Sequence, residues 1–569
     1  MASELPPPTK KRIILCCDGT WQNSGNGLMQ IPSNVTRISR CFKRRCRDGV
    51  FQVIYYQSGV GSRSDLIDHL LGGALGVGIA ENIREAYAYL CANYVDGDEI
   101  VIVGFSRGAF TARSIGGIIS DLGLLTRKGM YFFYPVFKDM QNWMNPDYQD
   151  PFPQQPFSDK PKGGDAVYEY RKRLLEKGYT RVKQHRGQGD LIRVKAIGVW
   201  DTVGALGFPE IEHGFHALGL DETRRPFTPT LWERQSEDQD SSDLRQVWFP
   251  GSHNNVGGGC EDQGVANTTL AWMMDQLASV GCEFRGDCLD RVYERNREYY
   301  LNASARSEVS ILTELAACCR GAPAKKPRPW AVHSIFEPNN PVRPWSLHAI
   351  ETDPSPLYAL AGYKTRSPGM YRKINPDTGR PLKAFLEDTN ERIHSSVRVR
   401  LACGGLGPND SGVWHCPALL KYWRPCQVAQ QFDDPVPRVA SWGPQGSNNE
   451  PKVTSIVDTS DKLSRGSTDT DETAKGAENE SKDIASKGGD KAADIPTEYI
   501  GPEAAAPKVR TMVEENMGPF ERHLLELSSG KVPVICYAEN QDPSTFKAFT
   551  HKALRKAMKQ AEDSQEPAV

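Results

Sequence analysis

The feature that most constrains this chain is a serine flanked by glycines, set where one apolar run gives way to another. Residues 99–103 (EIVIV) have the length and composition of a strand, and residues 109–119 are small and apolar, as in a packed helix. Residues 104–108 between them read Gly-Phe-Ser-Arg-Gly. A sharp strand-to-helix turn lifts its serine above the sheet edge, and glycines omit side chains that would clash there. The pattern predicts Ser106 as a nucleophile; the alternative is an ordinary turn with a solvent-facing serine.

Further runs of strand length and a helical period surround this turn. The apolar runs lie at residues 12–17, 50–56, 192–200 and 244–249. Apolar residues recur at steps of 3 and 4, the period of one helix face, at Ile79, Ile83, Ala86, Leu90 and Tyr94. Strands that alternate with helices predict a parallel sheet covered on both faces. We therefore expect an α/β fold of the α/β-hydrolase type, with a mostly parallel central sheet, helices on both of its faces, and insertions.

Composition divides the chain into four expected parts. The catalytic core spans residues 10–305, and its aromatic-, Pro- and Lys/Arg-rich insertion at 130–190 is expected over the carboxyl edge of the sheet, as a lid. A C-terminal extension at 306–430 is expected to pack on the core. Residues 436–505 are mostly Ser, Thr, Lys, Asp, Glu, Gly and Ala, too polar to offset the entropy of ordering, so we expect a disordered linker. The tail at 506–569 is expected to be partly helical, with weak patterns at 509–527 and 543–561.

Two later strand ends supply the partners that a serine nucleophile needs, a general base and an acid that orients it. Asp201 follows the apolar run ending at Trp200, and His253 follows the run 247–249 and precedes three closely spaced glycines. The order Ser, Asp, His is that of the α/β-hydrolases, and all three side chains would emerge at the carboxyl edge of one sheet. The alternatives are a turn-forming aspartate and a structural histidine.

Three other polar residues compete for roles in this site. His394, in the run Ile-His-Ser-Ser-Val, is the rival base. His216 and Asp221 are weaker rivals, and their pattern favours a pocket wall or the polar face of a helix. Residues 72–78 (GGALGVG) do not match a phosphate-binding loop, because no Gly-Lys-Ser/Thr follows them and no strand directly precedes them.

Backbone N–H groups near the serine are the expected ligands of the oxyanion that forms in acyl transfer. Arg107 directly follows the nucleophile at the start of a helix, whose dipole favours negative charge. A second N–H is expected from Gly19 or Thr20, just after the first strand. Asp18 is a secondary candidate, as a cation site, and the alternative for this segment is a capped turn.

Composition excludes several kinds of partner. A formal net charge of −2 over 569 residues supplies no field for nucleic acid. No apolar run approaches the roughly 18 residues of a membrane span, which allows only peripheral membrane contact, and no pattern indicates the oligomeric state. The polar, Pro-rich start lacks the apolar core of a signal peptide, so we expect a cytoplasmic protein whose 14 cysteines are reduced. Cys41 and Cys46 have no second ligand pair at metal spacing, so we expect no metal. The expected acyl transfer implies no organic cofactor.

Several motifs together resemble one family. They are D-G-T-W (18–21), P-S-N-V (32–35), G-F-S-R-G-A (104–109), V-W-D-T-V-G (199–204) and W-F-P-G-S-H-N-N-V-G-G-G (248–259). Over about residues 10–425 the chain resembles the α/β-hydrolase domain of type VI secretion phospholipase effectors of the first lipase class, formerly a domain of unknown function. H-A-L-G-L-D-E (216–222) and N-T-T-L-A-W-M-M (267–274) resemble its fungal branch.

The resemblance implies an α/β-hydrolase fold and a triad of Ser106, Asp201 and His253. It also implies hydrolysis of a carboxylic ester of a lipid, phospholipids included, or of a small molecule. Two other classes stay open. One is a catalytically inactive hydrolase fold that acts as a binding or scaffold protein. The other is a metal-dependent, phosphate-handling enzyme centred on Asp18 and the loop at 72–78.

Overall fold

The computed structural model of this protein contains two compact units, Met1–Arg424 with Gly501–Ser529, and Pro425–Ile500 with Gly530–Val569. The structure describes residues 10–19, 31–59, 77–145, 147–181, 183–185, 188–190, 192–203, 211–234, 242–308, 329–332, 336–337, 340–352, 362–375, 380–420, 423–426, 498–500 and 511–528. Two short strands, β14 (Arg424–Cys426) and β15 (Glu498–Ile500), belong wholly or mainly to the second unit. The rest of the predicted linker at 436–505, and the helical pattern at 543–561, lie outside the described residues.

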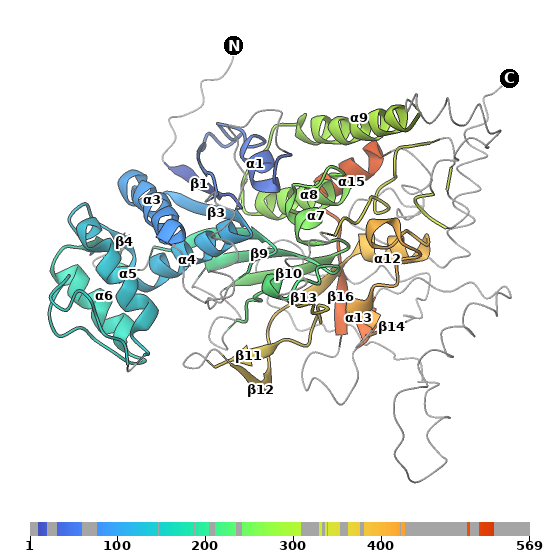
Figure 1. Cartoon of the computed structure of the whole chain (residues 1–569). Coiled ribbons are helices and arrows are strands. Elements are labelled where there is room, and N and C mark those ends of the chain that lie inside the picture. Colours follow the sequence, from blue (N-terminus) through green and yellow to red (C-terminus); the bar gives the residue numbers. More distant parts are fainter. Residues whose placement is uncertain are drawn as a thin grey trace, which may run out of the picture. The chain divides into compact units, whose positions relative to one another are not determined.

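A sheet of parallel strands is the centre of the first unit (Figure 1). Each neighbouring pair among its eight strands is parallel, which confirms the predicted α/β fold. In spatial order the strands are β2 (Phe51–Gln57), β1 (Lys11–Cys17), β3 (Glu99–Phe105), β8 (Val194–Trp200), β9 (Ile211–Gly219), β10 (Asp243–Phe249), β13 (Glu391–His394) and β16 (Thr511–Glu515).

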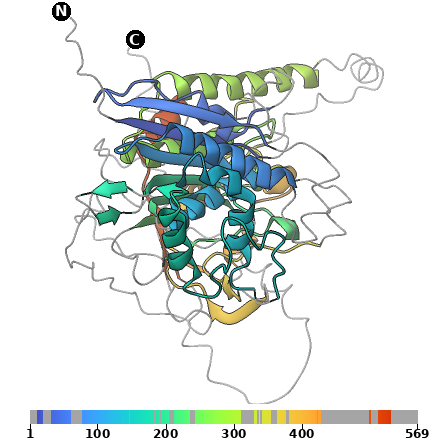
Figure 2. The ribbon, with the colours of Figure 1, turned by 90° about the vertical axis from the view of Figure 1, so that its left-hand side faces the viewer.

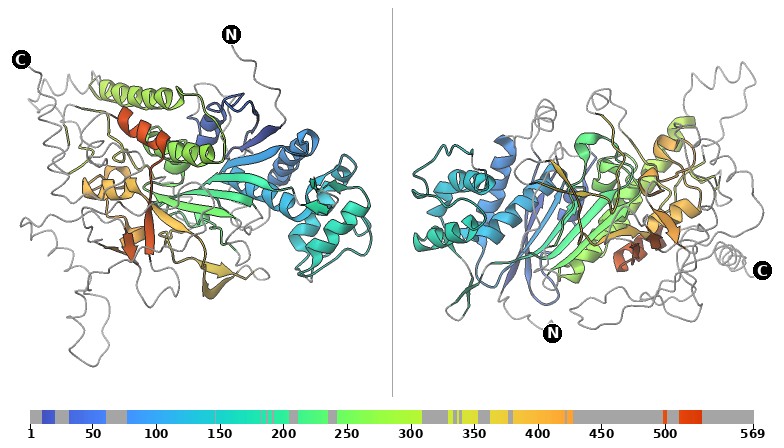
Figure 3. Two further views of the ribbon diagram at one scale, coloured as in Figure 1. Left: turned by 180° about the vertical axis from the view of Figure 1, so that it is seen from behind. Right: turned by 90° about the horizontal axis from the view of Figure 1, so that it is seen from below.

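Helices cover both faces of this sheet, as Figures 1 and 3 show. One face carries α3 (Val77–Asn93) and α4 (Arg107–Leu122). The other face carries α1 (Asn34–Ser39), α8 (Gly264–Ser279), α9 (Cys288–Glu308) and α15 (Pro519–Leu527). Alternate strand residues serve the two layers: Ile13 and Ile197 join the core under α3 and α4, whereas Gly198 lies against Met273 of α8. The central strands are therefore apolar on both faces.

The insertion after α4 does not lie where the sequence analysis placed it. It contains β4 (Leu124–Leu125), η2 (Gly129–Phe132), α5 (Phe133–Asn142), α6 (Ala166–Glu176), β5 (Thr180–Arg181), β6 (Lys183–His185) and β7 (Gln188–Asp190). Arg181 binds the carbonyls of Cys91 and Tyr94, and Thr180 binds that of Leu122. These carbonyls lie where α3 and α4 end, at the amino edge of the sheet. The end of the insertion thus contacts the amino edge of the sheet, whereas the sequence analysis predicted a lid over the carboxyl edge.

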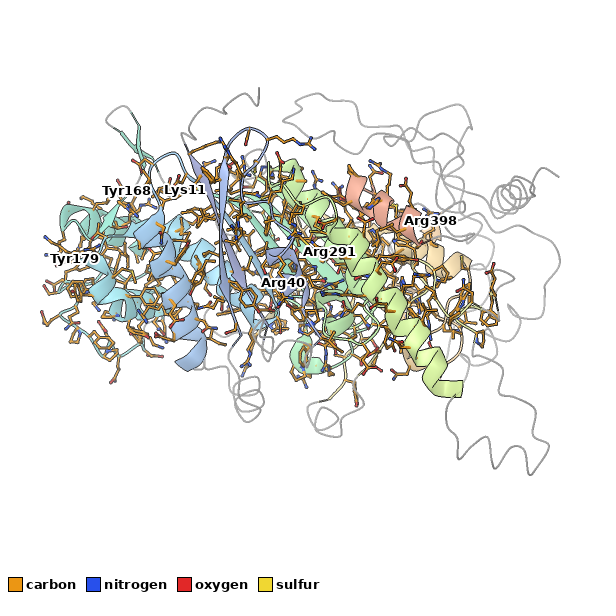
Figure 4. The ribbon with its side chains drawn as sticks, turned by 90° about the horizontal axis from the view of Figure 1, so that it is seen from above. Lys11, Arg40, Tyr168, Tyr179, Arg291 and Arg398 are labelled. Atoms are coloured by element: carbon orange, nitrogen blue, oxygen red, sulfur yellow. The ribbon has the colours of Figure 1, made fainter. Side chains whose placement is uncertain are left out.

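Figures 2 and 4 show the same arrangement from two sides. Figure 2 looks onto the insertion, with its helices in front of the sheet. In Figure 4, Tyr168 and Tyr179 of the insertion lie at one end of the first unit, and Arg398 lies toward the other end. Arg398 belongs to α12 (Ser395–Ala402), which follows the seventh strand of the sheet. The insertion thus extends the side on which α3 and α4 pack.

The C-terminal part of the first unit completes the sheet. The remaining elements of the first unit are η3 (Arg225–Phe227), α7 (His253–Gly257), β11 (Arg372–Ile374), β12 (Pro381–Phe385), η4 (Pro408–Asp410) and α13 (Pro417–Leu420). Residues 511–515 form a strand rather than the predicted helix, because the edge of β13 offers them parallel pairing at Ile393 and His394. The following helix α15 is fixed on α8 by Asp275, which accepts the N–H groups of Phe520 and Glu521 at 2.9 Å each.

Among the helices that the structure describes, none has both the length and the apolar character that crossing a bilayer requires.

The turn from β3 into α4 brings backbone unusually close to backbone. A Cβ atom on Gly108 would lie 2.1 Å from the carbonyl oxygen of Cys17, and one on Gly104 would lie 2.5 Å from that of Gly108. Both glycines of the predicted motif are therefore required by packing of α4 against the ends of β1 and β3, as the clash argument predicted. A Cβ atom on Gly117, in the same helix, would have no such neighbour within 4 Å.

These contacts predict opposite effects for two glycine-to-alanine substitutions in one helix. Gly108→Ala should destabilise the protein by about 1–3 kcal/mol, because the backbone must move to admit a methyl group. Gly117→Ala should stabilise it by about 0.5–1 kcal/mol, because alanine restricts the unfolded chain and fits the helix. Urea unfolding followed by circular dichroism measures both, and equal effects of the two substitutions would contradict the close approach.

Candidate active site

Ser106 occupies a strained turn between β3 and α4. Its φ and ψ are 55° and −120°, a conformation that residues with side chains rarely adopt. Its N–H donates to the carbonyl of Trp200 at 3.2 Å, which ties the turn to the end of β8. Strain that is held by surrounding structure is typical of functional positions, and this conformation matches the sharp turn of a strand–nucleophile–helix motif.

Asp201 and His253 lie together at the carboxyl edge of the sheet. Asp201 follows β8 and His253 begins α7, just after β10. Nδ1 of His253 is 2.6 Å from Oδ2 of Asp201, and both side chains are buried. An ionised carboxylate only accepts hydrogen bonds, so Nδ1 carries the proton and Nε2 is the nitrogen with a free lone pair.

Aromatic packing holds the imidazole beside the serine turn. The ring of His253 packs against Phe105, the residue before Ser106, with ring centroids 4.7 Å apart. Phe227 covers the imidazole as well, at 4.8 Å. Because Phe105 pairs with Trp200 across β3 and β8, Ser106 and Asp201 are neighbours at the ends of adjacent strands. The structure thus brings all three predicted residues to one place.

Arg366 is part of this site, although the sequence analysis did not find it. Its guanidinium binds both carboxylate oxygens of Asp201, with Nη2 at 2.7 Å from Oδ2. Burial alone would raise the pKa of Asp201, but the charge of Arg366 and the hydrogen bond from His253 outweigh it and hold that pKa well below its usual range. Asp201 is therefore ionised at every pH near neutrality.

Comparison with known proteins gives a family match for the N-terminal half of the first unit. Residues 11–276 match the family described as "T6SS, Phospholipase effector Tle1-like, catalytic domain". This segment is similar to the members of that family. It contains Ser106, Asp201 and His253, whereas Arg366 lies outside it.

The individual relatives cover only part of the chain. The uncharacterized protein YEL023C of Saccharomyces cerevisiae is 28% identical over an alignment of 243 residues, and the match covers 38% of this chain and 32% of the yeast protein. The chain therefore spans about a third of that relative's length. A crystal structure of an uncharacterized protein from Pseudomonas aeruginosa is 16% identical, covering 49% of this chain and 47% of that one, with a TM-score of 0.29. The structure of the Tle1 effector bound to the VgrG spike is 17% identical, covering 44% and 52%, with a TM-score of 0.22.

The first loop of the matched segment is organised around Asp18. The buried carboxylate accepts hydrogen bonds from Ser33 and Thr36 at 2.6 Å each and from Tyr56 at 2.7 Å. It also accepts the N–H of Gly19 at 2.7 Å, so this predicted oxyanion donor is occupied by its own neighbour. Burial raises the pKa of Asp18, and these hydrogen bonds oppose the rise. The other predicted donor, Thr20, lies outside the described residues.

The two rival histidines have other partners. Nε2 of His394 is 2.5 Å from Glu521, and its Nδ1 accepts the N–H of Ser396, so both ring nitrogens serve the attachment of α15 and the start of α12. His216 lies on β9, where Nε2 accepts the N–H of Thr202 and Nδ1 is 3.2 Å from Gln246. His216 thus supports the turn that follows Asp201.

Two acidic residues after β9 hold the histidine segment. Asp221, the other weak rival, accepts the N–H of Gly251 at 2.6 Å and the indole N–H of Trp414 at 2.8 Å. Glu222 accepts the N–H of His253 at 3.2 Å and forms an ion pair with Arg224. The motif H-A-L-G-L-D-E contains Glu222, yet its spacing alone does not reveal that it meets His253. Among the described residues, no three His, Cys, Asp or Glu side chains gather as a metal site.

The burial of His216 predicts a pH dependence of stability. Burial lowers the pKa of His216 to about 3, with the charge of Arg113 as the next cause. As pH falls below about 6.5, the imidazole of His216 binds a proton in the unfolded chain but stays neutral in the folded protein. The free energy of unfolding therefore falls. His216→Gln keeps an acceptor for Thr202 but does not titrate. The loss of unfolding free energy between pH 7 and pH 5 should then shrink by about 2 kcal/mol.

Urea unfolding at pH 7 and pH 5 measures this difference. His415→Gln, at an exposed position, is the control. The same pH dependence in wild type and His216→Gln would show that His216 is not held neutral.

Proposed function

We propose that this protein is a serine hydrolase that cleaves a carboxylic ester through Ser106, His253 and Asp201. The match of residues 11–276 to a phospholipase-effector family supports hydrolysis in general. The single observation that carries the proposal is the 2.6 Å contact between His253 and Asp201 next to the strained turn of Ser106. A buried, ionised aspartate that fixes the tautomer of a histidine beside a serine is the arrangement that activates a hydroxyl.

In the proposed reaction, Nε2 of His253 takes the proton of Ser106 as its Oγ attacks the ester carbonyl. The tetrahedral intermediate collapses, and His253 gives the proton to the departing alcohol. Water, deprotonated by the same Nε2, then attacks the acyl-enzyme and releases the acid. Asp201 stabilises the imidazolium in both steps and keeps its own charge.

The oxyanion is best bound at the start of α4. Arg107 is the first residue of this sixteen-residue helix, whose N-terminus carries partial positive charge. The N–H of Gly19 could join it only by leaving the carboxylate of Asp18, since that carboxylate accepts it at 2.7 Å. We therefore assign the main oxyanion contact to the backbone of Arg107 and keep Gly19 and Thr20 as the second predicted position.

We propose a lipid ester as substrate, with phospholipids first among the candidates. The support is the name of the matching family, which describes a phospholipase effector. Small-molecule esters are the second candidate class, because fold and catalytic residues transfer between substrates more readily than specificity does.

The assignment of the nucleophile predicts the site of covalent labelling. A fluorophosphonate probe should label the wild-type protein and fail to label Ser106→Ala, because the probe needs an activated hydroxyl. Ser114→Ala is the matched control, since Ser114 is a buried serine of the same helix and should be dispensable for labelling. Equal labelling of Ser106→Ala and wild type would rule out Ser106.

Turnover separates a hydrolase from an inactive binding protein. Fatty acid release from phosphatidylcholine vesicles, and cleavage of short p-nitrophenyl esters, should fall at least about a thousandfold in His253→Ala. Binding of vesicles without release of fatty acid, by wild type and variant alike, would favour the scaffold class. Unchanged activity in a chelator would count against the metal-dependent alternative.

A further inference from the structure

Arg366 makes several contacts in the candidate site, although no sequence motif predicted a role for it. It is buried, and besides Asp201 its guanidinium binds the carbonyls of Gly219 at 2.6 Å and Phe227 at 2.9 Å. Phe227 is the residue whose ring covers His253. The guanidinium therefore contacts both the carboxylate that binds His253 and the peptide chain that surrounds the imidazole.

The loop that carries Arg366 is anchored on both sides. Gly362 accepts the N–H of Arg225, and the N–H of Lys364 binds the carbonyl of Thr223 at 2.7 Å. Beyond the arginine, the N–H of Gly369 donates to Glu391 at 2.8 Å. These bonds connect the loop to the segment after β9 and to β13, so Arg366 is presented by a fixed backbone rather than by a free side chain on the surface.

We propose that Arg366 is a positioning residue that sets the pH range in which the Asp201–His253 pair can accept the serine proton. This inference rests on the proposed function, because it concerns the same site. Arg366 lies beyond the matched residues 11–276, so the later part of the first unit supplies a residue on which the matched segment depends.

Electrostatics gives the direction of the effect. A proton taken up by the pair adds positive charge next to a guanidinium, and two like charges within about 4–6 Å oppose each other. Removing the charge of Arg366 therefore lets the pair take up a proton at higher pH, whether that proton resides on His253 or Asp201. The general base then already carries a proton over a wider range of acid pH.

Geometry adds a second contribution. Oδ2 of Asp201 is shared by Nη2 of Arg366 at 2.7 Å and Nδ1 of His253 at 2.6 Å, while Oδ1 accepts the other Nη and the N–H of Gly219. The carboxylate cannot rotate without breaking this set. A bidentate guanidinium is the side chain best suited to fix a carboxylate plane.

Other titratable groups lie near the pair, and the surroundings of each shift its pKa. Burial lowers the pKa of His216 to about 3. Burial opposes ionisation of Glu222, but Arg224 outweighs it and lowers the pKa of this carboxyl. Burial raises the pKa of Asp221, and it raises that of Tyr371 far above neutrality. Arg366 is a permanent charge in direct contact with Asp201.

A series of substitutions separates charge from packing. Arg366→Met and Arg366→Gln are neutral, and glutamine keeps a hydrogen-bond donor; Arg366→Lys keeps the charge. The acid limb of the pH profile of kcat/KM should move up by about one to two pH units in both neutral variants. On the acid side this shift corresponds to roughly ten- to a hundredfold lower kcat/KM. Arg366→Lys should keep the wild-type limb with a lower kcat.

The matched control is Arg343→Met, which breaks a similar pair. Arg343 binds both carboxylate oxygens of Asp410, at 2.7 and 2.6 Å, in the same C-terminal part of the chain. This variant should leave the acid limb in place even if it unfolds more easily. A neutral variant of Arg366 that retains the wild-type limb, or a lysine variant that shifts it as far as glutamine does, would overturn the proposal.

A measurement without turnover keeps this test independent of the proposed function. NMR of histidine-labelled protein follows the imidazole of His253, assigned by its loss in His253→Gln. The pH at which this signal responds should be higher in Arg366→Gln than in wild type. If the wild type neither turns over esters nor reacts with fluorophosphonate, the hydrolase proposal fails, while this shift still decides the role of Arg366. If both neutral variants fail to fold, the lysine variant decides it: a shifted response there refutes the charge argument.

Discussion

The buried carboxylate of Asp201 is the interaction on which the rest of the candidate site depends. A carboxylate taken out of water costs several kcal/mol unless charge and hydrogen bonds replace the lost hydration. Arg366, His253 and the N–H of Gly219 supply that replacement. Through these contacts the ends of β8 and β9, the start of α7 and a distant loop meet at one point. Catalytic geometry and the attachment of the C-terminal segment are therefore stabilised by the same charge.

Local sequence was sufficient to predict where the site residues that follow apolar strands would lie. Ser106, Asp201 and His253 could be placed at one sheet edge because parallel strands end on the same side, and the glycines around Ser106 follow from the clash that any side chain would cause. The structure brings these residues together as expected.

Other features depend on tertiary contacts that no local pattern encodes. Arg366 sits in Thr-Arg-Ser-Pro-Gly, which follows no strand, and only the need of a buried carboxylate for a countercharge could have pointed to some arginine. The N–H of Gly19 is occupied by Asp18, a competition that motif matching cannot detect. The end of the insertion packs at the amino edge because the hydrogen bonds of Thr180 and Arg181 go to the ends of α3 and α4. Residues 511–515 pair as a strand because β13 offers an edge.

The late position of β16 has a consequence for biosynthesis. Strand β13 ends at His394, but its parallel neighbour begins only at Thr511. While the ribosome is translating the intervening codons, the hydrogen-bonding edge of β13 has no partner from β16, and exposed edges invite pairing with other chains. The pairing of β13 with β16 can therefore form only after residues 511–515 have been synthesised. Length changes between these two strands would alter how long the nascent chain carries that open edge.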